Sequence, residues 1–120
     1  MKFLFFIIVL ACVSCSSHKV FVVRHAERAT QGPNMSSDVP LSEIGKERAE
    51  ALKVMLENEK IEEIFSTNTT RTKTTAQPTA DHFRKTIQIY GPMPDSAFIQ
   101  LLKSKRKNVL VVGHSNTVDD

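Results

Sequence analysis

Two histidines and two arginines follow soon after apolar segments of the sequence. Arg24 and His25 follow the run at 20–23, His114 comes soon after the run at 109–112, and Arg71 follows a shorter segment at 63–66. A guanidinium group is a fixed fork of donors that matches phosphate oxygens. An imidazole nitrogen can attack phosphorus where cations neutralise the charge on the phosphoryl oxygens. These residue types therefore indicate phosphoryl chemistry, in which one histidine attacks and the other stabilises.

Such side chains meet only if the segments before them are strands of one sheet, because the carboxyl ends of parallel strands share an edge. The runs at 20–23 and 109–112 are rich in valine and do not alternate, which predicts strands buried on both faces. Residues 63–66 and 86–90 are weaker strand candidates, bounded by polar or turn residues. The three groups of polar residues are thus expected at one sheet edge.

Three helices are expected between these strands. Ser42 is the predicted N-cap of a helix reaching about residue 58. Its expected apolar face consists of Ile44, Ala51, Leu52, Met55 and Leu56. A second helix is predicted within 68–83, where Pro78 must kink or interrupt it. The third starts at the cap Asp95 and ends in a basic cluster. The alternation predicts an α/β three-layer sandwich with a mainly parallel central sheet.

Four blocks of the sequence resemble the histidine phosphatase superfamily, also called phosphoglycerate mutase-like. The blocks are Val22-Val23-Arg24-His25-Ala26-Glu27, Leu41-Ser42-Glu43-Ile44-Gly45-Lys46-Glu47-Arg48-Ala49, Ser66 through Arg71 to Thr75-Ala76, and Val112-Gly113-His114-Ser115. The resemblance extends over residues 20–117. It implies the phosphoglycerate mutase-like fold, and it implies a family helix after the His114 block. Because the chain ends six residues after His114, we expect this copy of the fold to be truncated at its C-terminus.

The resemblance also implies roles for individual residues. His25 would be the nucleophile that forms a phosphohistidine, and Arg24, Arg71 and His114 would bind the phosphoryl oxygens. Asn116 is a further candidate for phosphate binding. Ser66 and Gly45 fall inside the matching blocks and are expected to shape the loops. No cofactor and no metal are expected, although His25, His114 and Asp119 could together be ordinary zinc ligands.

Hydrolysis of a phosphoester also needs a general acid for the leaving oxygen. In the family a Glu or Asp after the Thr-Ala block usually supplies it, which points to Asp95, although Asp95 is also the expected helix cap. Glu27 is the second candidate. The predicted function is a metal-independent phosphatase acting on phosphomonoesters or phosphohistidine, of a small molecule or a phosphoprotein. The alternatives are a non-catalytic phosphate-binding module of the same fold and a phosphoglycerate mutase-type phosphotransferase.

The first fifteen residues have the pattern of a secretory leader. Lys2 precedes an uncharged run from 3 to 13 that ends in small residues around Cys12 and Cys15. This run is shorter than the roughly 20 residues of a spanning helix. The stretch resembles a bacterial lipoprotein processing site, which implies a lipid on Cys15 or Cys12. The expected organisation is a leader at 1–15, a tether at 16–19 and a phosphatase domain at 20–120, anchored to a bacterial membrane on its periplasmic or cell-surface side.

Length and composition limit the remaining possibilities. A chain of 120 residues with 41% apolar and 24% charged residues is the size of one globular domain. Both cysteines lie in the leader, so no disulfide can hold the domain together. Without Lys2 the net charge is +2, and no aromatic residue interrupts the one basic cluster. The composition therefore does not favour nucleic acid as a partner.

Overall fold

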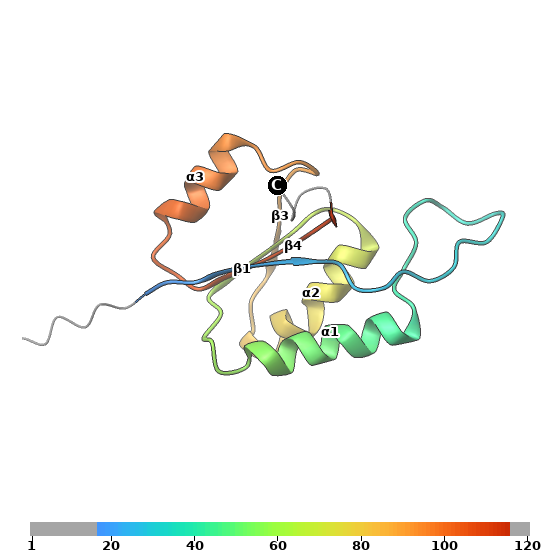
Figure 1. Cartoon of the computed structure of the whole chain (residues 1–120), viewed down its shortest axis with the longest axis horizontal. Coiled ribbons are helices and arrows are strands. Elements are labelled where there is room, and N and C mark those ends of the chain that lie inside the picture. Colours follow the sequence, from blue (N-terminus) through green and yellow to red (C-terminus); the bar gives the residue numbers. More distant parts are fainter. Residues whose placement is uncertain (1–16, 116–120) are drawn as a thin grey trace, which may run out of the picture.

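The structure is a computed structural model that describes residues 17–115. Its centre is a four-stranded parallel sheet with the strand order β1-β4-β2-β3 (Figure 1). The strands are β1 (Val20–Arg24), β2 (Glu63–Ser66), β3 (Ile87–Ile89) and β4 (Val109–Gly113). The helices are α1 (Glu43–Leu56), α2 (Thr70–Phe83) and α3 (Ser96–Ser104). Strands and helices alternate along the chain, as predicted.

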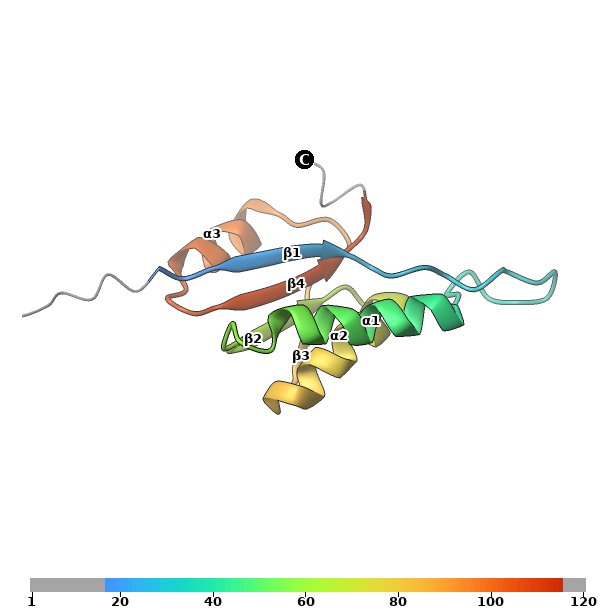
Figure 2. The same ribbon diagram turned by 60° about the horizontal axis from the view of Figure 1, so that its bottom comes forward.

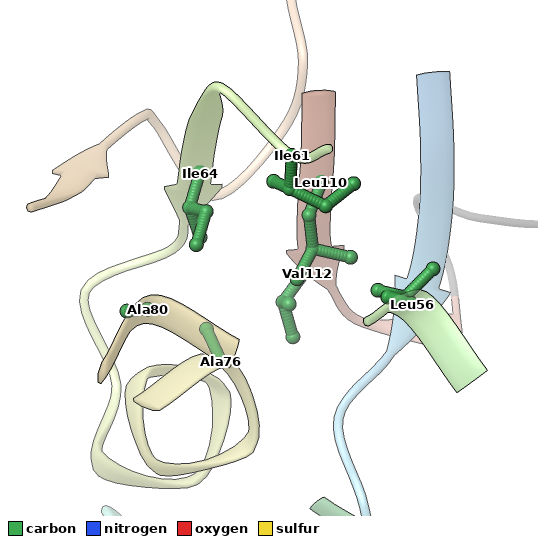
Figure 3. Close-up of a cluster of buried hydrophobic side chains, with 7 residues drawn as sticks. All are labelled: Leu56, Ile61, Ile64, Ala76, Ala80, Leu110 and Val112. Atoms are coloured by element: carbon green, nitrogen blue, oxygen red, sulfur yellow. The ribbon is translucent and has the colours of Figure 1, made fainter. Parts of the chain in front are cut away.

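The helices cover the two faces of the sheet, which gives three layers (Figure 1). On the face of α1 and α2, the core consists of Leu56, Ile61, Ile64, Ala76, Ala80, Leu110 and Val112 (Figure 3). On the opposite face, Phe98 and Leu102 of α3 pack against Phe65, Val109 and Val111. The prediction of a three-layer α/β sandwich is confirmed, and within 17–115 every strand pair is parallel.

The two valine-rich strands differ in burial. All five residues of β4 are buried between β1 and β2, as expected for a central strand. The prediction for β1 was wrong, because this strand is at the edge of the described sheet and only Phe21 and Val23 turn toward the core. Val20 and Val22, on the other face, are 42% and 47% exposed. Figure 2 shows β1 with β4 beside it at the edge of the sheet, and on this face α3 packs against residues of β2 and β4.

Helix α1 begins where the sequence predicted, but it buries a different face. The Ser42 side chain accepts a hydrogen bond from the Gly45 backbone N–H, which satisfies a free donor of the first turn. Gly45, Ala49 and Leu56 are the buried residues of α1. Ile44 and Met55 are 62% and 77% exposed, so their assignment to the core face was wrong. The buried face of α1 carries small residues because two segments approach it closely: α2 packs beside Ala49, and the backbone of Glu27 lies against Gly45.

Helix α2 runs through Pro78 without interruption, so of the two expected effects, a kink or an interruption, the interruption does not occur. Proline lacks the N–H that would bond to the preceding turn. The helix persists because Ala76 and Ala80, on either side of Pro78, are buried in the core. At its C-terminus Arg84 adopts the left-handed conformation with φ 55° and closes the last turn through its backbone N–H.

Helix α3 is capped by Asp95, whose carboxylate accepts a hydrogen bond from the Phe98 backbone N–H at 2.8 Å. In the basic cluster that follows, Lys105 lies 2.6 Å from Glu63, and its side chain is only 20% exposed. The cluster is therefore partly neutralised by a neighbouring strand.

Several sequence-based predictions fall outside residues 17–115. They are the leader and its lipid on Cys12 or Cys15, the phosphate contact of Asn116, and the metal ligand Asp119. Within 17–115, none of the helices has the length and apolar character needed to cross a bilayer.

Candidate active site

Three strands bring the chemically active side chains to the carboxyl edge of the sheet. Arg24 pairs in register with Gly113, and Ser66 pairs with Val112. The backbone N–H of His25 donates to the carbonyl of Gly113 at 2.9 Å, which extends the pairing of β1 and β4 by one residue. His25 and His114 therefore leave adjacent strands at the same level. Their rings lie edge to face, with centroids 5.5 Å apart.

The ring of His25 is held by its own backbone. Its Nδ1 atom lies 2.7 Å from the carbonyl oxygen of Ala26, and a carbonyl oxygen can only accept. Nδ1 therefore carries a proton, and in the neutral ring the lone pair is on Nε2. This is the nitrogen that can attack an electrophile.

The segment after His25 is fixed by two helices. The Ala26 N–H donates to the Thr75 hydroxyl of α2 at 3.0 Å. The Glu27 carbonyl accepts from the Ser42 backbone N–H at 2.9 Å, at the start of α1. Gly45 lies directly against this segment, and a Cβ atom there would overlap the carbonyl oxygen of Glu27. Gly45 is thus required for close approach, as expected of a residue that shapes the loop.

Arg71 lies in the first turn of α2 and is the best-buried of the site's cations. Its side chain is 17% exposed, and its buried Nε atom has no hydrogen-bond partner within 17–115. Asp38 lies 4.0 Å from the Arg71 Nη1 atom and also accepts from the backbone N–H and the hydroxyl of Thr70. The N-cap of α2 is Thr69, and Asp38 satisfies a further free donor of the first turn, which fixes the helix end that carries Arg71. Arg24 is exposed at the end of β1.

Burial and positive charge lower the pKa of both histidines below its ordinary value. For His25, desolvation is the largest cause, and Arg71, Arg24 and Arg28 act in the same direction against the Ala26 carbonyl. For His114, desolvation again lowers the pKa most, followed by Arg71, His25 and Arg24. Because the ordinary value is 6.5, both rings are mainly neutral at pH 7.

A groove of about 960 Å³ opens beside His25, between the segment after β1 and helix α1. Arg24, Arg28 and Arg48 line it together with Glu27, which pairs with Arg48, and Leu52 and Met55 supply apolar wall. Arg71 and His114 are not among its lining residues. It is large enough for a phosphorylated small molecule or an extended side chain.

The candidate acids and Ser66 have other contacts in the structure. Glu27 pairs with Arg48 at 2.8 Å, and Asp95 caps α3. Ser66 is fully buried and donates to the Thr67 carbonyl, so it shapes the loop. Residues 17–115 contain no group of three imidazole, thiol or carboxylate side chains placed to hold a metal ion.

Sequence reasoning missed Asp38 and three threonines, Thr67, Thr72 and Thr75. The Thr67 hydroxyl lies 3.0 Å from His114 Nε2 and donates to the Thr72 hydroxyl. The Thr75 hydroxyl donates to the Arg71 carbonyl and accepts from the Ala26 N–H. The one available signal was the density of threonine between 67 and 75, beside the predicted phosphate-binding arginine.

Comparisons with known proteins agree with this arrangement. The family model of the histidine phosphatase superfamily (branch 1) matches residues 20–91. The structure is similar to SixA from Agrobacterium tumefaciens, with a TM-score of 0.69, 23% identity, and coverage of 83% of this chain and 70% of that one. A protein histidine phosphatase SixA complexed with tungstate gives a TM-score of 0.69 and 23% identity, covering 82% of this chain and 70% of that one.

A phosphoserine phosphatase from Entamoeba histolytica, in complex with 3-phosphoglyceric acid, gives a TM-score of 0.60 at 16% identity, covering 80% of this chain and 73% of that one. At these identities the structural likeness establishes the fold alone. No curated protein sequence matches the chain. The family model covers more than half of the 120 residues, including the block of Arg24 and His25 and that of Arg71. The chain therefore belongs to the histidine phosphatase superfamily.

Proposed function

We propose that the chain is a phosphatase that hydrolyses phosphomonoesters or phosphohistidine through a phosphohistidine intermediate on His25. The observation that carries the proposal is the ring of His25. It is held with Nδ1 on the Ala26 carbonyl, is neutral at pH 7, and lies beside His114 and the partly unpartnered guanidinium of Arg71.

The reaction would proceed in two displacements. In the first, His25 Nε2 forms a bond to phosphorus while the bond from phosphorus to the leaving oxygen or nitrogen breaks, and the leaving atom takes a proton. In the second, water attacks phosphorus, loses a proton and releases His25 with inorganic phosphate. Arg71, Arg24 and a protonated His114 would stabilise the charge on the equatorial oxygens. Asp95 and Glu27 remain the candidates for the general acid.

Metal independence and the substrate range are parts of the same proposal. Arginine and imidazole cations can supply the positive charge that a metal ion supplies elsewhere. The SixA structure bound to tungstate supports an anion pocket in this fold, since tungstate is an oxyanion. The phosphoserine phosphatase supports phosphomonoesters as one substrate class.

Trapping the intermediate tests this function. The full chain is incubated with a ³²P-labelled aryl phosphate or phosphohistidine in the presence of chelator and quenched in alkali. We expect acid-labile label on the wild type and on His82→Ala, whose histidine is exposed in the last turn of α2, at the opposite end of that helix from Arg71. His25→Ala should lose both the label and turnover. Turnover that survives in His25→Ala would refute the proposal, and vanadate binding without hydrolysis in the wild type would indicate a binding module.

We also propose that the domain is exported and anchored to a bacterial membrane through a lipid on Cys12 or Cys15. The support is the charge and hydropathy pattern of residues 1–15. Cells grown with a fatty-acid analogue should label the wild type, and one of Cys12→Ala and Cys15→Ala should abolish the label. Absence of label from the wild type would refute lipidation.

A further inference from the structure

Behind His114 lies a chain of buried hydroxyl groups that the reaction scheme above does not use. Thr67 directly follows β2, and Thr72 is in the first turn of α2. They are 1% and 0% exposed. The Thr67 hydroxyl lies 3.0 Å from His114 Nε2 and 3.0 Å from the Thr72 hydroxyl. The three polar groups therefore form a continuous chain that ends at the imidazole.

The donor and the acceptor of each hydrogen bond can be assigned by starting from Thr72, the hydroxyl farther from His114 along this chain of groups. The Thr72 hydroxyl lies 2.9 Å from the Thr67 carbonyl and 3.1 Å from the Thr69 carbonyl, and carbonyls only accept. Thr72 therefore uses its single proton on these carbonyls. Its oxygen is left to accept from the hydroxyls of Thr67, at 3.0 Å, and Thr69, at 2.8 Å.

This assignment determines the bond to His114. Since Thr67 donates its only hydroxyl proton to Thr72, its oxygen can only accept from the imidazole. His114 Nε2 must then carry a hydrogen. The opposite direction would place two hydroxyl oxygens 3.0 Å apart with no hydrogen between them, in a site where neither reaches water.

We propose that Thr67 and Thr72 are positioning residues that hold His114 as the Nε2–H tautomer, so that the proton His114 gains and loses is carried on Nδ1. His25 is held in the opposite way, with its hydrogen on Nδ1 and its lone pair on Nε2. With His25 held by the Ala26 carbonyl and His114 held by the hydroxyl chain, the two adjacent imidazoles are in opposite tautomers. The inference deepens the proposed function, because it assigns which nitrogen of the second histidine exchanges a proton during turnover.

The charges around His114 determine when its ring takes up a second proton. Arg71 from α2, and His25 and Arg24 from the end of β1, all disfavour the protonated ring in the free protein. A bound phosphoryl dianion reverses that field and favours protonation. With Nε2 already occupied by its hydrogen, the added proton can enter only at Nδ1.

Nitrogen NMR of the imidazoles tests the assignment without any turnover. The purified ¹⁵N-labelled full chain is recorded above pH 7, and His114→Gln identifies the His114 resonances among the four histidines. In the wild type, Nε2 of His114 should show the chemical shift of a protonated nitrogen, and Nδ1 should show that of a nitrogen without a hydrogen. A wild-type ring protonated on Nδ1 would overturn the proposal.

The free histidine side chain already favours a hydrogen on Nε2, so the wild-type tautomer alone does not reveal the effect of the threonines. The decisive variant is therefore Thr72→Val. Valine keeps the shape of threonine but removes the acceptor for Thr67, whose hydroxyl can then donate to His114 Nε2. We expect the tautomer ratio of His114 to shift roughly tenfold toward Nδ1–H, as for the loss of one hydrogen bond. An unchanged ratio would contradict the proposal.

Three further variants separate this role from a general effect on folding. Thr79→Val is the matched control, since Thr79 is on the same helix and fully buried, and its hydroxyl has no hydrogen-bond partner within 17–115. It should leave the tautomer ratio unchanged. Thr67→Ser keeps the hydroxyl and should retain Nε2–H, whereas Thr67→Val should lower kcat more than it raises KM. Failure of Thr67→Ser to retain Nε2–H would argue against the hydroxyl as the cause. An inactive chain with the expected tautomers would refute the proposed function only.

Discussion

Strands β1 and β4 have nearly the same sequence character but different positions in the sheet. They are neighbours in register, and each ends one residue before a histidine of the site. Val111 of β4 is 4% exposed, and its register partner Val22 of β1 is 47% exposed. The central strand is fixed by neighbours on both sides, and the edge strand is fixed by one.

This difference shows that the two histidines are positioned by different means. His114 leaves a fully buried strand and contacts Thr67 of the adjacent turn. The segment after His25 depends instead on contacts with Thr75 of α2 and with Ser42 and Gly45 of α1. His25, the proposed nucleophile, is therefore positioned mainly by contacts with helices, although its strand brings it to the sheet edge.

Gly45→Ala tests this dependence most strongly. In an ordinary helix the change stabilises by up to about 1 kcal/mol. Here the new Cβ would overlap the Glu27 carbonyl, so the backbone next to His25 must move. We expect a loss of about 1–3 kcal/mol in the free energy of unfolding and loss of most phosphatase activity. Gly32→Ala is the control, because its Cβ would meet only the flexible Met35 side chain at 3.4 Å. Equal activity of the two variants would contradict the role of α1.

The valine pair tests the difference in burial directly. Val111→Ala removes two buried carbon atoms and leaves a cavity, so urea unfolding should show a loss of about 2 kcal/mol. Val22→Ala, the same change on the neighbouring strand and on the same sheet face, should cost less than about 1 kcal/mol because the side chain is half exposed. Similar losses would mean that β1 is covered in solution.

In their response to pH the two histidines should behave alike. Both have a lowered pKa in the folded chain, so the unfolded chain binds more protons between that lowered value and the ordinary 6.5. Stability is therefore fully present above pH 6.5 and decreases as the pH falls through the lowered values. Urea titrations at several pH values from 5 to 8 measure this trend, and the double variant His25→Gln, His114→Gln should reduce it. A stability that rises on acidification within this window would show that the pKa shifts have the opposite sign.

The same lowering affects activity. If His25 is the nucleophile, as proposed, its ring must be neutral to react, so the acid limb of kcat/KM should lie below pH 6.5. A limb above this value would contradict a lowered pKa for His25.

Much of the fold was predictable because its signals are local. The apolar runs predicted β2 and β4, and Ser42 and Asp95 were correctly identified as helix caps from their types and places. The exposed face of α1 was not predictable, because Ile44 and Met55 have the hydropathy of core residues. Close packing on α2 selected Ala49 for the buried face instead, and close approach of the Glu27 backbone selected Gly45.

The sequence alone determined the chemistry available to this protein. Arginines and histidines follow its strands, which predicted that they meet at one sheet edge, and the blocks of sequence around them resemble the family that the family model then matched. Only the tertiary structure decided how the imidazole rings are held, since the Nε2 partner of His114 is remote in the chain and the Ala26 segment that holds His25 is itself fixed by a remote threonine. Thr67 and His114 are 47 residues apart, and Ala26 and Thr75 are 49 apart. Residue type specifies what a group can do, and the fold specifies which of its atoms is in position to do it.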